Sequence, residues 1–303
     1  MRSEELGKGQ WGKEDKGDKG ELQSTHPCIQ NLKFSYPSLL TPHSSLPTFM
    51  QEPILTPEAA IAALAGEDNQ IRYYAAWWLG KHQVQSACAA LCEALTDDRY
   101  RLEAGGYPLR RQAARALGQL KNSQAVPALI EALNCQEDLQ LREAVIQALA
   151  AIGDRRAINP LLDLLHSQQQ PDEALIEALG TLQVWSARPQ IEPCLQHPSE
   201  RVQCAAARYM YLLTRESHYI ERIIKTLNHD NVYLRWAAIF DLGAIGQSQE
   251  VIQAIIAAKV PNNLKLLNLK QILEANLNGD ARDTISSDSG LLFNAIDDLL
   301  IQL

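Results

Sequence analysis

The chain has 303 residues, of which 28 are Lys or Arg and 36 are Asp or Glu, giving a formal net charge of -8. This charge excludes a protein whose affinity comes from neutralising phosphates, so we expect no nucleic-acid partner. Hydrophobic residues make up 46% of the chain, enough for a large core. No run reaches the roughly 20 apolar residues that a membrane span needs, so we expect no such span.

Residues 1–49 differ in composition from the rest of the chain. Gly, Lys, Asp and Glu dominate the start, and a Ser-, Pro- and Thr-rich stretch with few apolar residues follows. Such a segment buries too little surface to offset its ordering entropy, so we predict a disordered N-terminal extension. Met50 stands just before the first helical pattern, which Pro57 opens. We therefore hypothesise that Met50 is the natural start.

Residues 50–277 contain an internal repeat that is visible in the second helix of each predicted helix pair. One position, here called the arginine column, recurs every 29 to 38 residues and holds Arg72, Arg110, Arg142, Asp172, Arg201 and Arg235. Three and seven places later come mostly Ala, Val and Leu, which form a buried seam, and the residue after the seam is small in five of six units. The drifting period excludes a tetratricopeptide array. We predict an all-α fold, a right-handed α-solenoid of about six to seven HEAT-like helix pairs, the seventh being degenerate near residues 251–277.

The positions one and five places after the arginine column, here called the strip positions, lie opposite the seam and line the concave side of HEAT-like stacks. In the second to fourth units they are polar: Arg111, Arg115, Glu143, Gln147, Glu173 and Glu177. Those residues alone are explained by a solvated polar strip. The first unit instead has Tyr73 and Trp77, and the sixth has Trp236 and Phe240. These aromatics indicate either a contact surface or burial under a cap.

An insert at residues 95–111, "LTDDRYRLEAGGYPLRR", lengthens the step between the first two units. Loops on a rigid scaffold often carry function. We expect its acidic, basic and aromatic side chains to gather near the first aromatic pair: Asp97, Asp98, Tyr107, Arg110 and Arg111, beside Tyr73 and Trp77. For Arg110, which belongs to the arginine column, a structural role is the alternative.

The chain closes with residues 278–303, a polar linker followed by an amphipathic helix that packs either on the last repeat or on a partner. The six cysteines form no CxxC pair, and no secretory leader is visible, so we expect reduced, apolar thiols, no metal site and a cytoplasmic protein. Nucleotide-binding, hydrolase and metalloprotease motifs are lacking, which disfavours conventional nucleophilic or metal catalysis.

Two segments carry a family likeness: residues 72–80, "RYYAAWWLG", and residues 105–118, "GGYPLRRQAARALG". They resemble the E-type subunit of the E/F heterodimeric bilin lyases, and the likeness extends over about residues 56–277. The stretch "DRYRLEAGGYPLRR" departs from the "DRTELGGYPLRR" expected of the phycocyanin lyase. The related phycoerythrocyanin lyase-isomerase, in which isomerisation depends on the F partner, is therefore a second candidate.

The resemblance implies an enzyme that, with its F-type partner subunit, joins phycocyanobilin to a phycobiliprotein alpha subunit. A cysteine thiol of the acceptor adds across the ethylidene of the bilin's A ring and forms a thioether. The bilin is a bound substrate, and no permanent cofactor is implied. The catalytic residues stay unknown, because no established set can be matched to this sequence.

A bilin site needs cations for two propionates, an anion for the pyrrole N–H groups and aromatic walls for the flat tetrapyrrole. As a hypothesis, these roles fall to Arg111 and Arg115, with Arg110 beside them, to Asp97, Asp98 or Glu143, and to Tyr73, Trp77 and Tyr107. Trp236 and Phe240 are assigned to contact with the F subunit or the acceptor. The alternative function is a non-catalytic adaptor that binds a protein or peptide on its concave face.

Overall fold

The computed structural model of the chain describes residues 56–167, 172–246, 248–278 and 287–302. The predicted extension at residues 1–49 and the proposed start at Met50 lie outside these residues, and both stay predictions. Within the described part the regular structure is entirely helical, and its helices come in pairs. The predicted α-solenoid of helix pairs is therefore confirmed.

The helices of each pair differ in length. The first helices are α2 (Pro57–Leu64), α4 (Cys88–Ala94), α6 (Val126–Ala132), α8 (Ile158–His166), α10 (Arg188–Ile191), α12 (Ser217–Thr226) and α14 (Gln249–Ala257). The second helices, most of them longer, are α3 (Asn69–Lys81), α5 (Pro108–Leu120), α7 (Leu139–Ile152), α9 (Asp172–Thr181), α11 (Glu200–Thr214), α13 (Val232–Ile245) and α15 (Asn262–Asn278). A last helix, α16 (Ser287–Ile301), follows the seventh pair.

Short 3-10 turns accompany the first helices of the middle units. They are η1 (Gln85–Ala87), η2 (Ser123–Ala125), η3 (Arg155–Ala157) and η4 (Trp185–Ala187), each directly before its helix, and η5 (Glu192–Gln196) directly after α10. Pro193 is the second residue after α10, and α10 itself has only 4 residues. The fifth unit thus departs from the regular helix pair.

Several second helices start at a side-chain cap. Asp68 accepts a hydrogen bond from the backbone N–H of Gln70 (2.8 Å), and Asp138 accepts one from the N–H of Leu141 (2.9 Å). Asn231 caps α13 in the same way. Each cap lies four residues before a member of the arginine column, so the column falls in the first turn of the helix.

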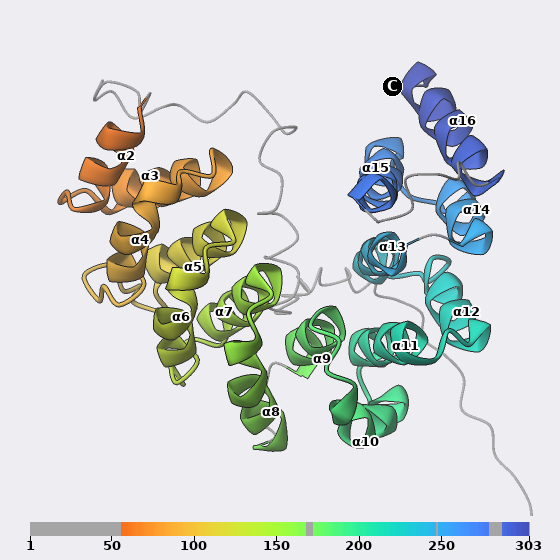
Figure 1. Ribbon diagram of the computed structural model, residues 1–303, viewed down its shortest axis with the longest axis horizontal. Coiled ribbons are helices and arrows are strands. Elements are labelled where there is room, and N and C mark those ends of the chain that lie inside the picture. Colours follow the sequence, from red (N-terminus) through yellow and green to blue (C-terminus); the bar gives the residue numbers. More distant parts are fainter. Residues whose placement is uncertain (1–55, 168–171, 247, 279–286, 303) are drawn as a thin grey trace, which may run out of the picture. The chain divides into compact units, whose positions relative to one another are not determined.

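The second helices pack against one another in chain order from α3 to α15, and each first helix packs against the second helix of its own pair. Figure 1 shows the two resulting layers. Close approach within the second-helix layer depends on the small residue after the seam. A Cβ added to Gly80 would lie 2.8 Å from the Cα of Ala116, and one added to Gly118 would lie 2.9 Å from the Cα of Ala148. The contacts of α3 with α5 and of α5 with α7 therefore require glycine at these positions.

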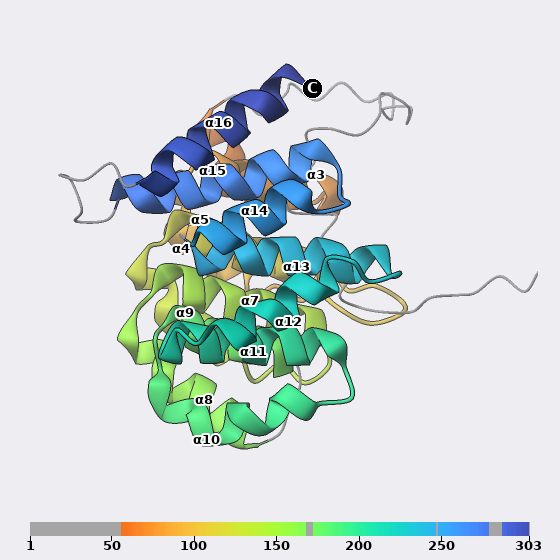
Figure 2. The same cartoon turned by 90° about the vertical axis from the view of Figure 1, so that its right-hand side faces the viewer.

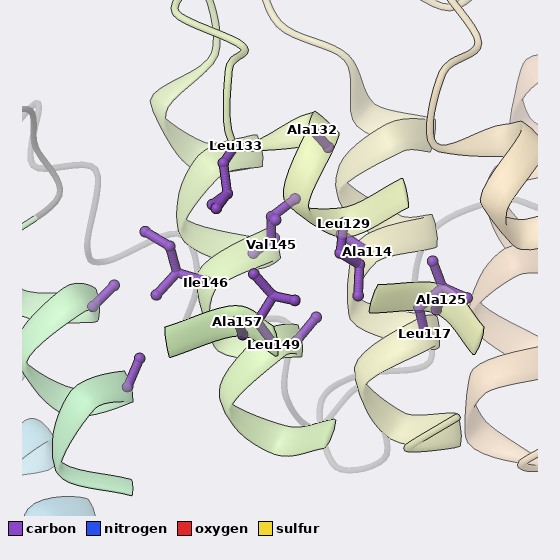
Figure 3. Close-up of a cluster of buried hydrophobic side chains, with 14 of the residues drawn as sticks. Ala114, Leu117, Ala125, Leu129, Ala132, Leu133, Val145, Ile146, Leu149 and Ala157 are labelled. Carbon is purple, nitrogen blue, oxygen red and sulfur yellow. The ribbon is translucent and has the colours of Figure 1, made fainter. Parts of the chain in front are cut away.

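The predicted seam is buried between the two layers. Figure 3 shows Leu117 of α5, Leu129 of α6 and Leu149 of α7 among the side chains of a buried apolar cluster, and all three are fully buried. The buried apolar side chains form two clusters, one between residues 60 and 210 and the other between residues 207 and 299. Helix α11 contributes to both clusters.

The C-terminal helix packs on the last repeat, which was one of the two predicted alternatives. Leu292, Ala295 and Leu299 of α16 are buried in the second cluster, and α16 lies against α14 and α15 (Figure 2). The opposite side of α16 exposes Phe293 and Leu300. Among the described residues, no helix combines the length and apolar character needed to cross a bilayer.

Candidate functional site

The arginine column first has a structural task. The Nε atom of Arg72 donates to the carbonyl of Leu64 (2.9 Å), Arg110 donates to Leu95 (2.7 Å), and Arg142 donates to Leu133 (3.2 Å). In each unit the accepting carbonyl lies at the C-terminal end of the first helix, where backbone acceptors lack partners within the helix. The column therefore ties the two helices of a pair together, and the structural alternative considered for Arg110 holds for its Nε atom.

The insert between α4 and α5 forms a tight loop held by the next unit. Gly105 and Gly106 adopt φ angles of 87° and 94°, in the left-handed region that favours glycine. The backbone N–H of Tyr107 donates to Asp138 (2.8 Å), the residue that caps α7. A Cβ added to Gly106 would collide with the guanidinium of Arg111. The loop, α5 and α7 thus meet at Asp138.

Asp138 also anchors the first of the predicted cations. Arg111 donates to its two carboxylate oxygens at 3.0 and 2.7 Å and also to Gln140. Burial alone would raise the pKa of Asp138, but the hydrogen bonds from Arg111, Tyr107 and Leu141 outweigh it and lower the pKa. Arg111 is therefore a fixed cation rather than a mobile one. Sequence reasoning missed Asp138, although its place four residues before Arg142, as Asp68 precedes Arg72, was a usable signal.

The two acidic residues of the insert are engaged with arginines. The side chain of Asp97 is 12% exposed and binds Arg72 and Arg99. Burial opposes its ionisation, but the hydrogen bonds from Arg99 and Arg72 lower its pKa to about 2. Asp98 is 74% exposed and pairs with Arg110 at 3.0 Å. Both carboxylates therefore support the loop in this structure.

Tyr107 lies between two arginines. Its ring is buried, with the guanidinium carbon of Arg110 4.6 Å and that of Arg101 5.7 Å from the ring centroid. Its hydroxyl donates to Glu137 (3.3 Å). The ring is thus already covered by cationic groups, which stabilise it by cation–π interaction.

Tyr73 and Trp77 of α3 are half-buried, so they are neither sealed in the core nor freely exposed. Burial raises the pKa of the Tyr73 phenol, while the nearby charges of Arg115 and Arg111 lower it in part. Burial likewise lowers the pKa of Arg115, against the opposing effects of Tyr73 and Glu143. The three helices α3, α5 and α7 therefore bring together the strip residues Tyr73, Arg111, Arg115 and Glu143.

Trp77 extends this group along α3. Its ring centroid lies 5.3 Å from that of Tyr74, and the Lys81 ammonium lies 4.7 Å from the Trp77 ring centroid. The result is an aromatic wall with cationic groups beside it, on the side of α3 that bears the strip positions.

The second aromatic pair lies on a different helix, α13, and does not join this group. Trp236 and Phe240 are half-buried and pack against the second apolar cluster. The Nε1 atom of Trp236 is buried and has no hydrogen-bond partner. Tyr233 approaches the Trp236 ring edge-on, with 6.0 Å between centroids.

A further cluster, which sequence reasoning did not identify, joins α9, α11 and α13. Arg201 donates to Glu173 (2.7 Å), and it also binds Glu177 and Asp241. Arg208 lies 3.6 Å from the other oxygen of Asp241. We call these five residues the Arg201 cluster. Its signal in the sequence was Arg208, which stands at a seam position where other units have Leu.

Three of the described thiols are poor nucleophiles. Burial raises the pKa of Cys88 and Cys204, and it raises the pKa of Cys92 to about 11. The chemical role that the site can perform is to position a bound molecule, with fixed cations, an aromatic wall and carboxylates on one layer of helices. Such a surface can hold an extended, anionic, aromatic molecule against a second reactant.

The repeat geometry defines an α-solenoid of the HEAT class, and comparison with known proteins agrees. HEAT repeats match residues 101–174, and the PBS lyase HEAT-like repeat matches residues 71–97 and 234–260. The chain is 73% identical to the bilin biosynthesis protein PecE of Mastigocladus laminosus over 83% of this chain and 97% of that protein. It is 46% identical to the phycocyanobilin lyase subunit alpha of Nostoc sp. PCC 7120, over 82% of this chain and 95% of that protein. The chain therefore belongs to the family of PecE and the phycocyanobilin lyase alpha subunits.

A solved structure of the same family has the same fold. A chain from the complex of CpcE and CpcF of phycocyanin lyase from Nostoc sp. PCC 7120 matches with a TM-score of 0.71 and 44% identity. The match covers 84% of this chain and 100% of that one. The helix pairs described above are thus the family's architecture.

Proposed function

We propose that this chain is the E-type subunit of a heterodimeric bilin lyase that works in the cytoplasm. With an F-type partner, it attaches phycocyanobilin through a thioether to a cysteine of a phycobiliprotein alpha subunit. The family membership supports this function, as does the likeness to a chain whose solved structure is a two-subunit lyase complex. The acceptor is the alpha subunit of phycocyanin or of phycoerythrocyanin, the latter with isomerisation by the partner.

The reaction needs positioning more than a protein nucleophile. The acceptor thiol adds across an activated double bond, so an S–H bond breaks while a C–S and a C–H bond form, without oxidation or reduction. Holding the thiol and the bilin together in the reactive geometry supplies much of the acceleration in such additions. A surface of fixed charges and aromatic walls is suited to this task.

The observation that carries the proposed site is the meeting of Tyr73, Arg115 and Arg111 across two adjacent helices. Arg115 and Arg111 hold the two propionates, and Tyr73 with Trp77 forms the wall for the tetrapyrrole. Tyr107 does not extend this wall, because its ring is buried and already covered by Arg110 and Arg101.

Of the acidic candidates, Glu143 suits the pyrrole N–H groups best. It lies close enough to Arg115 to affect that residue's pKa. Asp97 and Asp98 are instead bound to the arginines of the loop, which limits their reach toward a ligand. Trp236 and Phe240, on a separate helix, are assigned to the F subunit or to the acceptor.

The test compares bilin transfer by the wild type and by Tyr73→Ala/Trp77→Ala, each assembled with the F-type subunit. We expect the double variant to lose at least about tenfold in transfer rate, because stacking by aromatic walls contributes to bilin affinity and orientation. Tyr219→Ala is the matched control, since Tyr219 is a half-buried tyrosine on α12, in the other layer. Equal rates in the double variant and the control would contradict the site. A wild-type heterodimer that binds a peptide but yields no covalent pigment would favour the adaptor function.

A further inference from the structure

Arg201 stands in the arginine column but does not perform the column's task. In its unit the carbonyl after η5, that of His197, is taken by Gln203 (2.5 Å). The side chain of Arg201 therefore does not bind this carbonyl. It forms ion pairs with the carboxylates of Glu173, Glu177 and Asp241 instead. This arrangement differs from that of Arg72, Arg110 and Arg142.

The cluster places charges where other units have apolar residues. Arg208 replaces a seam leucine, and Asp241 occupies a position that is Ala116 in α5 and Ala148 in α7. The side chain of Asp241 is 1% exposed. Buried charges of this kind are costly and add little net stability compared with apolar packing. Departures from the local pattern that weaken the core are expected at functional positions.

The cluster lies on the same side of the second-helix layer as the proposed bilin site. Glu173 and Glu177 occupy the strip positions of α9, as Glu143 and Gln147 do in α7 and Arg111 and Arg115 do in α5. Helix α7 packs directly against both α5 and α9. The strip positions therefore continue from the bilin site into the cluster. The side chain of Glu177 keeps 22% exposure there, which leaves it accessible.

The balance of charges in the Arg201 cluster makes Glu177 the member whose carboxyl group titrates. Three carboxylates share two guanidiniums, so the fully ionised cluster carries one excess negative charge. Burial raises the pKa of Glu177 to about 7, and Glu173 and Asp241 add to the rise against the opposing charges of Arg201 and Arg208. By contrast, the lowered pKa values of Asp97 and Asp138 keep those carboxyls ionised, so they have no proton to donate.

We propose that Glu177, held in place by Arg201, is the proton-transfer residue of the lyase, an inference that rests on the proposed function. Its carboxylic acid gives a proton to the ring carbon next to the bilin ethylidene as the acceptor sulfur bonds to the ethylidene carbon. The resulting carboxylate then receives the proton released by the thiol. One C–S and one C–H bond form, the S–H bond and the π bond of the ethylidene C=C break, and Glu177 returns to its starting state.

The test measures covalent transfer by the heterodimer as a function of pH, for the wild type and Glu177→Gln. The amide keeps the size of the side chain but cannot exchange the proton, so we expect the rate at neutral pH to fall about 100-fold. The wild-type rate changes with a pKa near 7, and this change is absent in the variant. Bilin affinity, followed by absorbance titration, stays within about twofold because positioning alone is unaffected.

The matched control is Glu192→Gln, which breaks a surface pair with Arg188 by the same chemical change and leaves the rate and its pH profile as in the wild type. If Glu177→Gln does not fold, Glu177→Asp decides, because a shorter carboxylic acid lowers the rate but keeps the pH-dependent change. A wild-type rate and profile in Glu177→Gln, or a flat profile in Glu177→Asp, would overturn the role of Glu177 alone. A wild type that transfers no bilin would overturn the proposed function and this role with it.

Discussion

At the scale of single residues, the insert depends on one carboxylate and one glycine. Asp138 caps α7, accepts from the N–H of Tyr107 and binds Arg111, so a single side chain fixes a helix, a loop and a cation. Gly106 makes this possible in two ways. Glycine tolerates the φ of 94°, and the absence of a side chain leaves room for the guanidinium of Arg111. The placement of the cation in the proposed bilin site thus follows from a backbone requirement.

We predict that Gly106→Ala destabilises the protein more than Gly105→Ala does. Both glycines have positive φ, which costs an alanine about 1–2 kcal/mol. Only at Gly106 does the new methyl group also displace Arg111 from Asp138, which removes at least about 1 kcal/mol more. Urea unfolding of the two variants measures the difference. Equal losses of unfolding free energy would show that Arg111 is not held as described.

The protonation of Glu177 also changes the free energy of unfolding with pH. Because the pKa of Glu177 in the folded state is raised from 4.5 to about 7, its contribution to stability is full below about pH 4.5 and is lost as pH rises through about 7. Glu177→Gln lacks this loss. The variant therefore gains stability relative to the wild type between acidic and mildly alkaline pH, as denaturant unfolding at several pH values will report.

At the scale of the helix, an arginine of the column links the two helices in each of the first three pairs. Arg142 is 3% exposed, and it donates to the carbonyls of Leu133 and Cys135. We predict that Arg142→Met lowers the free energy of unfolding by about 2–4 kcal/mol, because one buried and one partly buried carbonyl lose their donor. Arg188→Met, in which only a surface pair is lost, leaves stability nearly unchanged. Comparable melting temperatures for the two variants would contradict the linking role.

The sequence predicted these elements where the pattern is local. The period of the arginine column, the buried seam and the small residue after it all reappear as the packed second helices, since each depends on helical spacing alone. The direction in which an arginine of the column points cannot be predicted from helical spacing, because it depends on residues that are distant in sequence. Arg201 points toward Asp241 because Gln203 takes its carbonyl and α13 supplies an acid 40 residues away. The Arg201 cluster therefore became visible only with the helices in place.

The candidate site likewise has features that could be predicted from helical spacing and features that could not. Tyr73, Arg111 and Arg115 were expected to gather because strip positions of adjacent helices face the same side, and they do gather. The pairing of Asp97 with Arg72 could not be read from spacing, since it depends on how the loop folds back. Loop geometry of this kind depends on tertiary contacts that no repeat encodes.

At the scale of the whole described molecule, the apolar core is interrupted where the charges enter. Helix α11 joins the two apolar clusters, and it carries both Arg201 and Arg208. The helix pairs on either side follow the regular repeat more closely. A solenoid whose units contact only their neighbours can accept such a break without losing its architecture. The Arg201 cluster can thus be partly buried between the second helices, while its members Glu173 and Glu177 still occupy strip positions.

In the proposed reaction, this chain and an F-type subunit together attach a bilin to an acceptor cysteine. The most direct measurement is a time course of covalent pigment on the alpha subunits of phycocyanin and phycoerythrocyanin, read as fluorescence after denaturing electrophoresis. We expect pigment to form on one acceptor, rapidly when both lyase subunits are present and only slowly and unselectively when either is left out. No covalent pigment with both subunits, or an equal rate without this chain, would contradict the proposed lyase function.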